Sequence, residues 1–454
     1  MLRRSSGRAR GLKRNEFMEK LTIEEIERIT DCKVLGNSDS NNCIDNITID
    51  SRKEASPTTL FIPIKGDNFD GRDYIDSFLK TSGGFTLDTN DGRKAIGILA
   101  RSYRSKFQIP VIAVTGSSGK TSTKEMIGAV CKSHYNTLST YGNLNNDLGV
   151  PLSIFEIDKK TEVAVLELGM SHFGEMSYLS SIVRPTMAVF TNIGTAHIGN
   201  LGSREGILKA KMELLDFIQP EGTVIINSDD DMLWKVYGEI PYKVISYGIN
   251  NSMTSVRANR VVSNDGQIDF EVIIDGNIHS VHLNLSGEHN VYNALAAISV
   301  GVCLNVPMKK IINALGNVTN EILGRQKKFQ VNGITIIDDC YNANLDSMLS
   351  SLDMLKNLQV KGNKYAVLGD MLELGEYSEA HHRKVGETAN SIDLKGIYTI
   401  GEASNSFING ISNENTEEIF EKLSNILQKG DAVLIKASHG MNLDKLVKEF
   451  EEKL

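Results

Sequence analysis

Residues 115–121, Thr-Gly-Ser-Ser-Gly-Lys-Thr, have the residue types and spacing of a phosphate-binding loop. They follow an apolar, strand-like run that begins at Val111 and precede a helical run. In that setting the backbone amides and the helix N-terminus hold an anion, Lys120 reaches the β- and γ-phosphates, and the Thr121 hydroxyl binds magnesium. The pattern G-x-x-x-x-G-K-[ST] is not fully met, because Val114 stands in place of the first glycine. The alternative is a glycine-rich turn with an incidental Lys-Thr pair, which the flanking strand and helix disfavour.

Glu167 and His197 are candidate metal ligands beside this loop. Glu167 ends the strand-like run 164–166, and His197 follows a strand that ends near Thr191. Ligands of open α/β sheets gather at the carboxyl ends of the strands, so both side chains can converge on the loop. A carboxylate and a neutral imidazole there suit Mg²⁺ that bridges ATP to a substrate. A solvated or structural role for each residue is an equal alternative.

Lys211 lies on the apolar face of a helix predicted over residues 205–218. It is four residues after Ile207 and four before Leu215, whereas Lys209 falls on the opposite face. Burial lowers the pKa of an amine, and a neutral amine can react with CO₂ to form a carbamate that binds a metal. For a lone lysine the commoner alternative is that the aliphatic part of the side chain lies along the edge of the apolar face and the ammonium reaches water.

The overall composition is that of an ordinary globular protein, with 41% hydrophobic and 23% charged residues among 454. At roughly 150 residues per domain, this length favours about three domains. No apolar run approaches the roughly 20 residues of a membrane helix, so no membrane span is expected. The net charge of -8 argues against broad nucleic-acid binding. The five cysteines lack zinc-site spacing and fit a reducing cytoplasm.

The basic N-terminal stretch, residues 1–16, has no apolar segment of the kind that a secretory signal needs. We interpret it as a disordered tail or an over-long translation start, with Met18 as the natural beginning.

Three zones follow along the chain. Residues 18–108 predict a mixed α/β domain, and residues 109–323 alternate strands and helices around the phosphate loop. Between residues 246 and 285 apolar side chains recur at every second residue, the pattern of a β-strand. This pattern predicts a small antiparallel sheet with hairpin turns at Asn264-Asp265-Gly266 and Asp275-Gly276. Residues 324–454 repeat a βαβ rhythm and predict a second, Rossmann-like α/β domain. Its expected strands are residues 334–337, 365–368, 397–400 and 432–435.

From Leu21 onward the sequence resembles the Mur ligases over nearly its whole length. Besides the phosphate loop, the motifs that carry this resemblance are residues 142–151 (GNLNNDLGVP), 167–170 (ELGM), 196–197 (AH), 209–211 (KAK), 287–297 (GEHNVYNALAA), 324–325 (GR) and 338–344 (DDCYNAN). The loop alone indicates only the wider family, whereas the NLNND and YNAN segments select the branch. This branch joins D-alanyl-D-alanine to UDP-N-acetylmuramoyl-tripeptide through an acyl phosphate in peptidoglycan precursor synthesis.

The resemblance implies a cytoplasmic, monomeric, ATP-dependent carbon-nitrogen ligase of three α/β domains. It implies catalytic roles for Lys120, His197, Lys211 and Asn342. It implies ATP contacts from Gly116, Ser117, Ser118, Gly119, Lys120, Thr121, Asn290, Arg325 and Asp339. It implies Mg²⁺ held by Thr121, Glu167, His197 and Lys211, the last as a CO₂-derived carbamate. Ser51, Arg52, Asn145, Asn146, Tyr341 and Asn344 are the implied substrate contacts.

One segment departs from the pattern of this branch. Residues 436–439 are Lys-Ala-Ser-His, where the branch commonly has Lys-Gly-Ser-Arg. Histidine in place of arginine weakens an anion contact at neutral pH, which leaves acceptor choice open. The alternatives are therefore a sister ligase with another amine acceptor, or a non-catalytic ATP-binding scaffold. A scaffold is disfavoured because Lys120, Glu167, His197 and Lys211 are all present.

Overall fold

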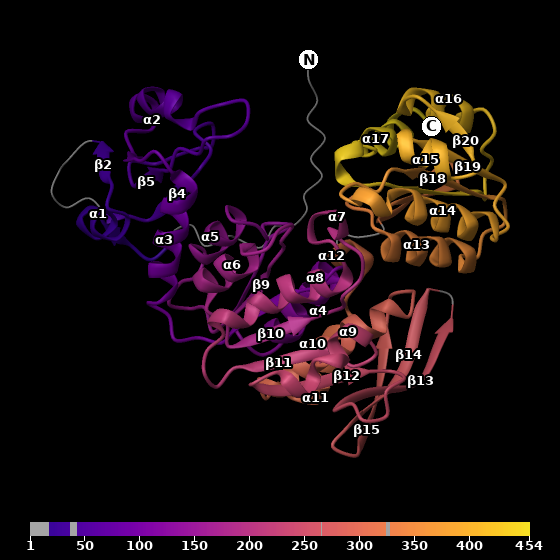
Figure 1. Ribbon diagram of the computed structural model, residues 1–454, viewed down its shortest axis with the longest axis horizontal. Helices are drawn as coiled ribbons and strands as arrows, with labels where there is room; N and C mark the ends of the chain where they lie inside the picture. Colours follow the sequence, from indigo (N-terminus) through magenta and orange to yellow (C-terminus); the bar gives the residue numbers. More distant parts are fainter. Residues whose placement is uncertain (1–17, 37–42, 265, 324–326) are drawn as a thin grey trace.

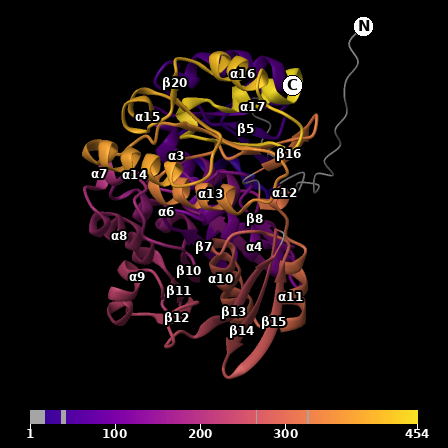
Figure 2. The same ribbon diagram turned by 90° about the vertical axis from the view of Figure 1, so that its right-hand side faces the viewer.

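The computed structural model describes residues 18–36, 43–264, 266–323 and 327–454. The N-terminal stretch 1–16 and Arg325 therefore lie outside the described residues. The chain forms three α/β bodies, and the N-terminal body (indigo) and the C-terminal body (orange to yellow) lie on the same side of the middle one (Figure 1). A view at right angles shows the same arrangement (Figure 2). Within the described residues no helix combines the length and apolar character that crossing a membrane requires.

The N-terminal body contains a four-stranded sheet in the order β2-β6-β5-β4, beside a short β1-β3 pair. Strand β5 is parallel to β4 and β6, whereas β2 is antiparallel to β6, so the predicted mixed α/β character is confirmed. Helix α1 begins after Thr22, whose hydroxyl accepts a hydrogen bond from the amide of Glu25. The elements are β1 (Leu21–Thr22), α1 (Ile23–Thr30), β2 (Lys33–Gly36), β3 (Cys43–Ile44), β4 (Asn46–Thr48), β5 (Thr59–Phe61), η1 (Gly71–Tyr74), α2 (Ile75–Ser82), β6 (Phe85–Asp88) and α3 (Gly92–Arg104).

The middle body is built on a nine-stranded sheet in the order β15-β14-β13-β12-β11-β10-β7-β9-β8. Its parallel part has buried apolar side chains on both faces because helices cover both. Helices α4, α10 and α11 cover one face, and α5, α6 and α8 cover the other. The elements of the parallel part and its helices are β7 (Val111–Thr115), α4 (Lys120–Lys132), β8 (Thr137–Ser139), α5 (Gly149–Ile154), β9 (Val163–Glu167), α6 (Glu175–Val183), β10 (Met187–Phe190), α7 (Ile198–Leu201), α8 (Arg204–Met212), η2 (Glu213–Phe217), β11 (Thr223–Asn227), α9 (Asp231–Lys235), η3 (Tyr237–Glu239), β12 (Lys243–Gly248), α10 (His289–Cys303), α11 (Met308–Gly316) and α12 (Asn320–Leu323).

The antiparallel strands of the middle body extend this sheet and do not form a separate one. Strand β13 (Val256–Asn264) pairs in parallel with β12 through Tyr247 and Val256, and β14 (Gln267–Ile274) and β15 (Asn277–Leu283) then pair in antiparallel fashion. The predicted turn at Asp275-Gly276 is confirmed, since both residues have positive φ angles of 48° and 79°. Asp265 of the other predicted turn lies outside the described residues, but Asn264 pairs with Gln267 across it.

The C-terminal body has a six-stranded sheet in the order β16-β17-β21-β18-β19-β20, parallel except for the edge strand β16. All four strands expected in this zone are confirmed. The elements are β16 (Lys327–Val331), β17 (Ile334–Asp338), α13 (Leu345–Asn357), β18 (Lys364–Gly369), η4 (Gly375–Tyr377), α14 (Ser378–Asn390), β19 (Gly396–Ile400), α15 (Glu402–Phe407), β20 (Ile411–Asn413), α16 (Thr416–Ser424), β21 (Ala432–Lys436), η5 (His439–Met441) and α17 (Asp444–Lys453). Each of the three bodies lies within one predicted domain range, although the boundaries themselves stay a prediction.

The helix predicted over residues 205–218 is wrong at its C-terminal end, because α8 stops at Met212 and a 3₁₀ turn follows. The groups of this turn bond to neighbouring elements. The Glu213 carboxylate accepts hydrogen bonds from the amide of Gly174 at 2.9 and 3.0 Å, and the Leu214 carbonyl accepts one from the Ser180 hydroxyl at 2.6 Å. Lys211 is therefore in the last turn of α8.

A buried arginine joins the last helix of the N-terminal body to the middle body. The Arg104 guanidinium donates hydrogen bonds to the carbonyls of Val183 at 3.0 Å, Phe107 at 2.5 Å and Ile109 at 3.4 Å. Burial lowers the pKa of Arg104 to about 10. The hydrogen bonds to Val183 and Phe107 are buried, and the one to Ile109 is partly buried.

Replacing Arg104 by leucine should lower the free energy of unfolding by roughly 3 kcal/mol, because two buried carbonyls and one partly buried carbonyl lose charge-assisted hydrogen bonds. The side chain of exposed Arg101 on the same helix lies over the Phe217 ring and makes no hydrogen bond or ion pair within the described part of the chain, so Arg101→Ala should cost less than about 1 kcal/mol. Urea unfolding measures both. Equal losses in the two variants would contradict the anchoring role of Arg104.

Candidate active site

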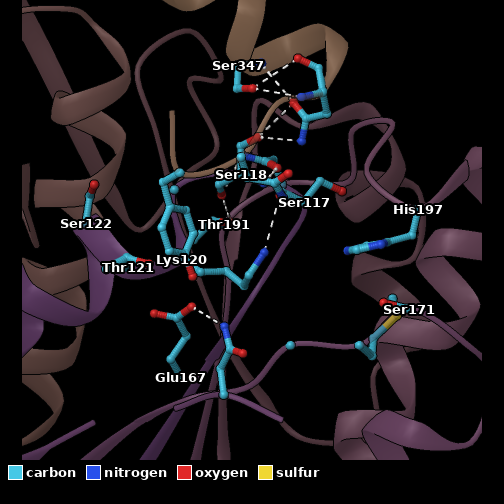
Figure 3. Close-up of a pocket in the computed structure, with 18 of the residues that line it drawn as sticks. Ser117, Ser118, Lys120, Thr121, Ser122, Glu167, Ser171, Thr191, His197 and Ser347 are labelled. Atoms are coloured by element: carbon cyan, nitrogen blue, oxygen red, sulfur yellow. Dashed lines mark hydrogen bonds between the residues drawn. The ribbon is translucent and has the colours of Figure 1, made fainter. Parts of the chain in front are cut away.

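A cavity of about 1180 Å³ opens above the carboxyl ends of β7, β9 and β10. Strand β7 lies between β10 and β9 in the sheet. The strands that follow β7 in the chain, β8 and β9, lie on one side of it, and β10 lies on the other, so the strand order reverses its direction at β7. That place is the usual ligand crevice of an open α/β sheet. The predicted phosphate loop, Glu167 and the turn before His197 follow these three strands and meet around the cavity (Figure 3).

The conformation of the phosphate loop depends on its glycines and on the turn after β10. Gly116 has a φ of 152°, and a Cβ atom there would lie 1.8 Å from the Thr191 hydroxyl oxygen. Gly119 has a φ of 78°, in the region that favours glycine. The Thr191 hydroxyl donates to the Ser118 carbonyl at 2.6 Å, and the Ser118 amide donates to the Asn192 side-chain oxygen at 2.9 Å. The neighbouring strand therefore holds the loop in shape.

Lys120 is the first residue of α4, and its ammonium lies over the loop. Its Nζ atom donates hydrogen bonds to the carbonyl oxygens of Gly116 at 2.8 Å and Ser117 at 3.3 Å. In Figure 3 the side chain lies between Glu167 and His197, whose ring is directed toward it. Lys120 and Thr121 both line the cavity.

Lys211 is buried, with 1% of its surface exposed, and is not among the residues that line the cavity. No hydrogen bond or ion pair of its amine occurs among the described residues. Burial in the first place, and the charge of Lys120 in the second, lower the pKa of Lys211 well below its ordinary value. Lys209 is exposed and lies over the Phe173 ring at 5.9 Å. The structure thus excludes an ammonium of Lys211 that reaches bulk water.

Glu167 supplies one unsatisfied oxygen to this region. Its Oε1 atom accepts a hydrogen bond from the Asn145 amide at 2.7 Å, whereas its buried Oε2 atom has no partner among the described residues. A buried carboxylate oxygen without a donor is costly, and a cation would satisfy it. The chemistry of this oxygen fits Mg²⁺.

His197 lies at the N-terminus of α7 with a φ of 63° and contacts the C-terminal body. Its Nδ1 atom pairs with the Glu373 carboxylate, and this hydrogen bond lowers the pKa of Glu373. No cluster of three or more His, Cys, Asp or Glu side chains suited to a metal occurs in the part of the chain that the structure describes. Glu167 and His197 could therefore hold Mg²⁺ only together with hydroxyl, carbamate, phosphate or water oxygens, as this ion commonly requires.

The C-terminal body closes directly on the phosphate loop. Asn344 caps α13 and its side chain lies 3.3 to 3.4 Å from the Ser118 hydroxyl. The Asp346 carboxylate accepts a hydrogen bond from the Thr195 amide at 3.1 Å. These contacts bring the YNAN segment to the cavity, which Tyr341, Asn342 and Asn344 line.

Most of the other predicted site residues also line this cavity. Asn290 is buried at the start of α10 and donates to the Ser286 carbonyl at 2.8 Å. Asp339, Asn145 and Asn146 line the cavity as well. Ser51 and Arg52 do not line it: the Arg52 side chain is exposed and pairs with Asp50 at 2.8 Å. Nothing is described for Arg325.

The buried positions of two further lysines, Lys124 and Lys436, were not predicted from the sequence. Lys124 is fully buried, and its ammonium binds the Glu125 carboxylate at 2.6 Å and the Thr140 carbonyl at 2.8 Å. The Thr140 hydroxyl in turn accepts the amide of Glu167 at 3.1 Å. Lys124 follows Lys120 by one helical turn, a spacing that could have indicated an inward position. It fixes the loop that positions Glu167 and Asn145.

Lys436 has the same kind of role on the C-terminal side. It is buried, pairs with Asp339 at 2.8 Å and donates to the Asn342 carbonyl at 3.1 Å. The Ser351 hydroxyl also donates to Asp339, at 2.5 Å. One carboxylate oxygen of Asp339 is thus held in place, and the backbone of the YNAN segment is held with it.

Comparison with known proteins agrees with this geometry. Residues 114–301 match the model of the Mur ligase middle domain, and residues 324–439 match that of the Mur ligase, glutamate ligase domain. The chain belongs to the Mur ligase family.

Individual relatives align with this chain over nearly its full length and nearly their own. The chain is 31% identical to UDP-N-acetylmuramoyl-tripeptide--D-alanyl-D-alanine ligase of Bacillus subtilis, over 96% of this chain and 99% of the relative. It is 34% identical to the ligase of that name from Synechocystis, over 89% and 92%. The crystal structure of MurF from Acinetobacter baumannii superposes with a TM-score of 0.86 at 30% identity, over 96% and 100% of the two chains. MurF of Thermotoga maritima in complex with ADP gives 0.79 at 28% identity, over 90% and 97%.

The buried amine of Lys211 makes stability depend on pH. Below its ordinary pKa of 10.5 the unfolded chain binds a proton there that the folded chain binds less readily, so stability rises with pH through this window. Lys211→Met should therefore be more stable than the wild type near pH 7, with a gap that narrows toward pH 10. Urea unfolding in CO₂-free buffer measures this gap, and Lys209→Met is the control. A gap that does not change with pH would refute the assigned burial.

Lys124→Met should loosen the loop of residues 140–146, because the buried Thr140 carbonyl loses its cationic donor. We expect a loss of about 1 to 3 kcal/mol in unfolding free energy and faster amide hydrogen exchange in that loop. Lys132 is exposed at the end of the same helix, so Lys132→Met should change neither measurement. Unchanged exchange in the Lys124 variant would remove its positioning role.

Proposed function

We propose that this protein is an ATP-dependent amide ligase that adds D-alanyl-D-alanine to UDP-N-acetylmuramoyl-tripeptide during peptidoglycan precursor synthesis. The observation that carries the proposal is the buried Lys211, whose pKa is lowered by burial and by the charge of Lys120 in the phosphate loop, within a chain that aligns over nearly its full length with ligases of this name. A buried lysine without a counter-ion among the described residues is unfavourable for stability, so a chemical role explains its position best.

The proposed reaction has two steps. A carboxylate oxygen of the tripeptide attacks the γ-phosphorus of ATP, the bond to the bridging oxygen breaks, and an acyl phosphate and ADP result. The amine of the dipeptide then attacks the acyl carbon, loses a proton, and phosphate leaves. Lys120 and the loop amides stabilise the charge on the transferring phosphoryl group, and the protein otherwise acts by positioning.

Thr121, Glu167 and His197 would hold Mg²⁺, together with Lys211 as a carbamate. Mg²⁺ supplies charge neutralisation for the phosphates. The carbamate would form when the neutral Lys211 nitrogen adds to CO₂ and releases a proton. The product is an anion, which would convert an unfavourable pair of amines into an attractive contact with the Lys120 ammonium.

The cleft suggests how the other ligands are divided. We assign Asn290, Arg325 and Asp339 to ATP, with Gly116, Ser117, Ser118 and Gly119 at its phosphates. Asn145, Asn146, Tyr341, Asn342 and Asn344 would face the peptide, and Asn342 would act at the reacting groups. Ser51 and Arg52 would contact the uridine nucleotide outside the cavity.

The domain limits that match this division are 18–108 for the nucleotide-peptide, 109–323 for ATP and 324–454 for the ligase domain. Contacts such as that of Asn344 with Ser118 support closure of the third domain over the second, which would keep water from the acyl phosphate. We propose a monomer, because all of these groups come from one chain. We also propose a cytoplasmic location, where ATP is available and where the five free cysteines would stay reduced.

A sister ligase with another amine acceptor is the nearest alternative, since His439 alters the motif from which the acceptor was inferred. Phosphate release from ATP, measured with the UDP-linked tripeptide and a panel of amines, distinguishes the two. Turnover with D-alanyl-D-alanine is expected. Silence with this dipeptide together with turnover of another amine rejects the assigned acceptor.

Lys211→Ala should lower the rate of ligation by roughly 100-fold or more, as losses of a charged group at a transferring phosphoryl typically do. Short carboxylates such as acetate should restore part of the rate, because they can occupy the place of the carbamate. Lys209→Ala, on the exposed face of the same helix, should keep full activity. A folded Lys211→Ala enzyme that is fully active without added carboxylate would eliminate the carbamate.

A further inference from the structure

The loop that follows β18 in the C-terminal body packs against the short helix α7 of the middle body. Helix α7 begins directly after His197, and the Gly199 amide donates a hydrogen bond to the Glu373 carbonyl at 3.0 Å. The Tyr377 hydroxyl donates another to the Gly202 carbonyl at 2.8 Å. Two backbone segments that are far apart in the sequence are thus joined beside a candidate metal ligand.

This docking depends on the absence of a side chain at Gly199. A Cβ atom there would lie 2.7 Å from both the Glu373 carbonyl oxygen and the Gly375 amide nitrogen, closer than real Cβ atoms approach backbone atoms. Gly199 has no positive φ angle, so the close approach requires glycine here and the backbone conformation does not. Gly238 of the same body is the contrast, because nothing lies within 4 Å of a Cβ atom built there.

Both side chains that meet at this contact belong to residues with a left-handed backbone. His197 has a φ of 63° and Glu373 has a φ of 61°. The left-handed region is unfavourable for residues other than glycine, and it persists where surrounding contacts impose it. It occurs here at both partners of one contact, which indicates a use of this contact beyond stability.

The contact determines which nitrogen of the His197 ring carries hydrogen. The Glu373 carboxylate lies against Nδ1, and an ionised carboxylate can only accept a hydrogen bond. In the neutral ring Nδ1 therefore holds the hydrogen, and Nε2 keeps a lone pair that can bind a cation. The ring is directed toward Lys120 in Figure 3, and it lines the main cavity. Metal-binding histidines commonly have their second nitrogen bonded to a carboxylate in this manner.

The two partners of this contact come from different bodies. Thr121 and Glu167 line the cavity from the middle body, as His197 does, but the carboxylate partner of His197 comes from the C-terminal body. The Glu373 side chain is 47% exposed even in this contact, so water can take the place of the ring when the two bodies separate. Without that partner either nitrogen of His197 can carry the hydrogen.

We infer that Glu373 is a positioning residue that fixes the tautomer and the orientation of His197 for metal binding. Because its loop must dock on α7 to do so, metal affinity in the middle body would depend on closure of the C-terminal body. The inference rests on the proposed function, which assigns His197 to Mg²⁺. In this account the cation is held tightly only once the cleft has closed and water is excluded from the reacting groups.

The first test measures binding of Mn²⁺, which suits the same oxygen-rich sites as Mg²⁺, to the full-length protein with ADP. Free Mn²⁺ is counted by electron paramagnetic resonance. Glu373→Ala should weaken Mn²⁺ binding by roughly 10- to 100-fold, the usual effect of removing the carboxylate partner of a metal-binding histidine. Glu373→Gln should weaken it less, because the amide oxygen can still accept a hydrogen bond from Nδ1. The Kd for ADP without metal should not change.

The second test observes the imidazole itself without any metal. Nitrogen-15 NMR of histidine-labelled protein distinguishes the two tautomers, and a His197→Ala sample identifies the signals of this ring. The wild type should show the hydrogen on Nδ1, and Glu373→Ala should show a mixture of the two tautomers. A contact that only stabilises the fold would not produce this change.

The dependence on docking is tested with a double-mutant cycle. Gly199→Ala should weaken Mn²⁺ binding about as much as Glu373→Ala, because the added Cβ atom keeps the loop away from α7. The double variant should be no weaker than either single variant, since both changes break one contact. Two controls should bind Mn²⁺ like the wild type. Gly238→Ala adds a methyl group in open space, and Asp269→Asn alters an exposed pair with His282.

The possible failures are distinct. Unchanged Mn²⁺ binding or an unchanged tautomer in Glu373→Ala overturns the inference and leaves the proposed function intact, as do additive losses in the double variant. Mn²⁺ binding to His197→Ala that equals the wild type removes this histidine from the proposed metal site and overturns the inference with it.

Discussion

The site depends on one electrostatic constraint, which is the buried Lys211 amine that feels the charge of Lys120 and has no carboxylate partner among the described residues. Burial in the first place, and repulsion by the charge of Lys120 in the second, favour the neutral form of the Lys211 amine in the folded chain. Glu167 adds a second unmet requirement, because one of its oxygens accepts a hydrogen bond from Asn145 and the other has no partner among the described residues. Under the proposed function, phosphates and a cation would supply the charges that these groups lack.

The fold resolves this constraint by bringing strand ends together. The loop after β7, the end of β9 and the turn after β10 meet because these three strands are neighbours in the sheet. Two further buried lysines then fix the loops that carry no regular structure of their own. Lys124 holds the segment before Asn145 from the middle body, and Lys436 holds Asp339 and the YNAN segment from the C-terminal body. Buried cations bonded to carbonyl groups order these loops at a site where exposed loops would move.

Local pattern predicted a large part of this fold and less of its site. The strands 111–115 and 432–436 are short, apolar and flanked by turn residues, so their period and length identified them. The end of α8 could not be predicted from the local sequence. Leu214 is apolar and continues the apolar stripe of the helix, but its carbonyl accepts a hydrogen bond from the Ser180 hydroxyl of another helix. The phosphate loop and the inward position of Lys211 followed from spacing alone. The pairing of His197 with Glu373 joins residues 176 positions apart, which no local pattern contains.

The same distinction explains why acceptor choice was the hardest property to predict. The groups that would hold the phosphates of ATP come from one contiguous strand, loop and helix, whereas a smaller cavity beside the main one takes its walls from several separate loops. The pair of Glu373 with His197 and the loop of residues 438–440 reach the same cavity only through the packing of the C-terminal body on the middle one. The phosphate loop is one contiguous segment, so its residue types and spacing are visible in the sequence, whereas a wall built from distant loops has no local pattern.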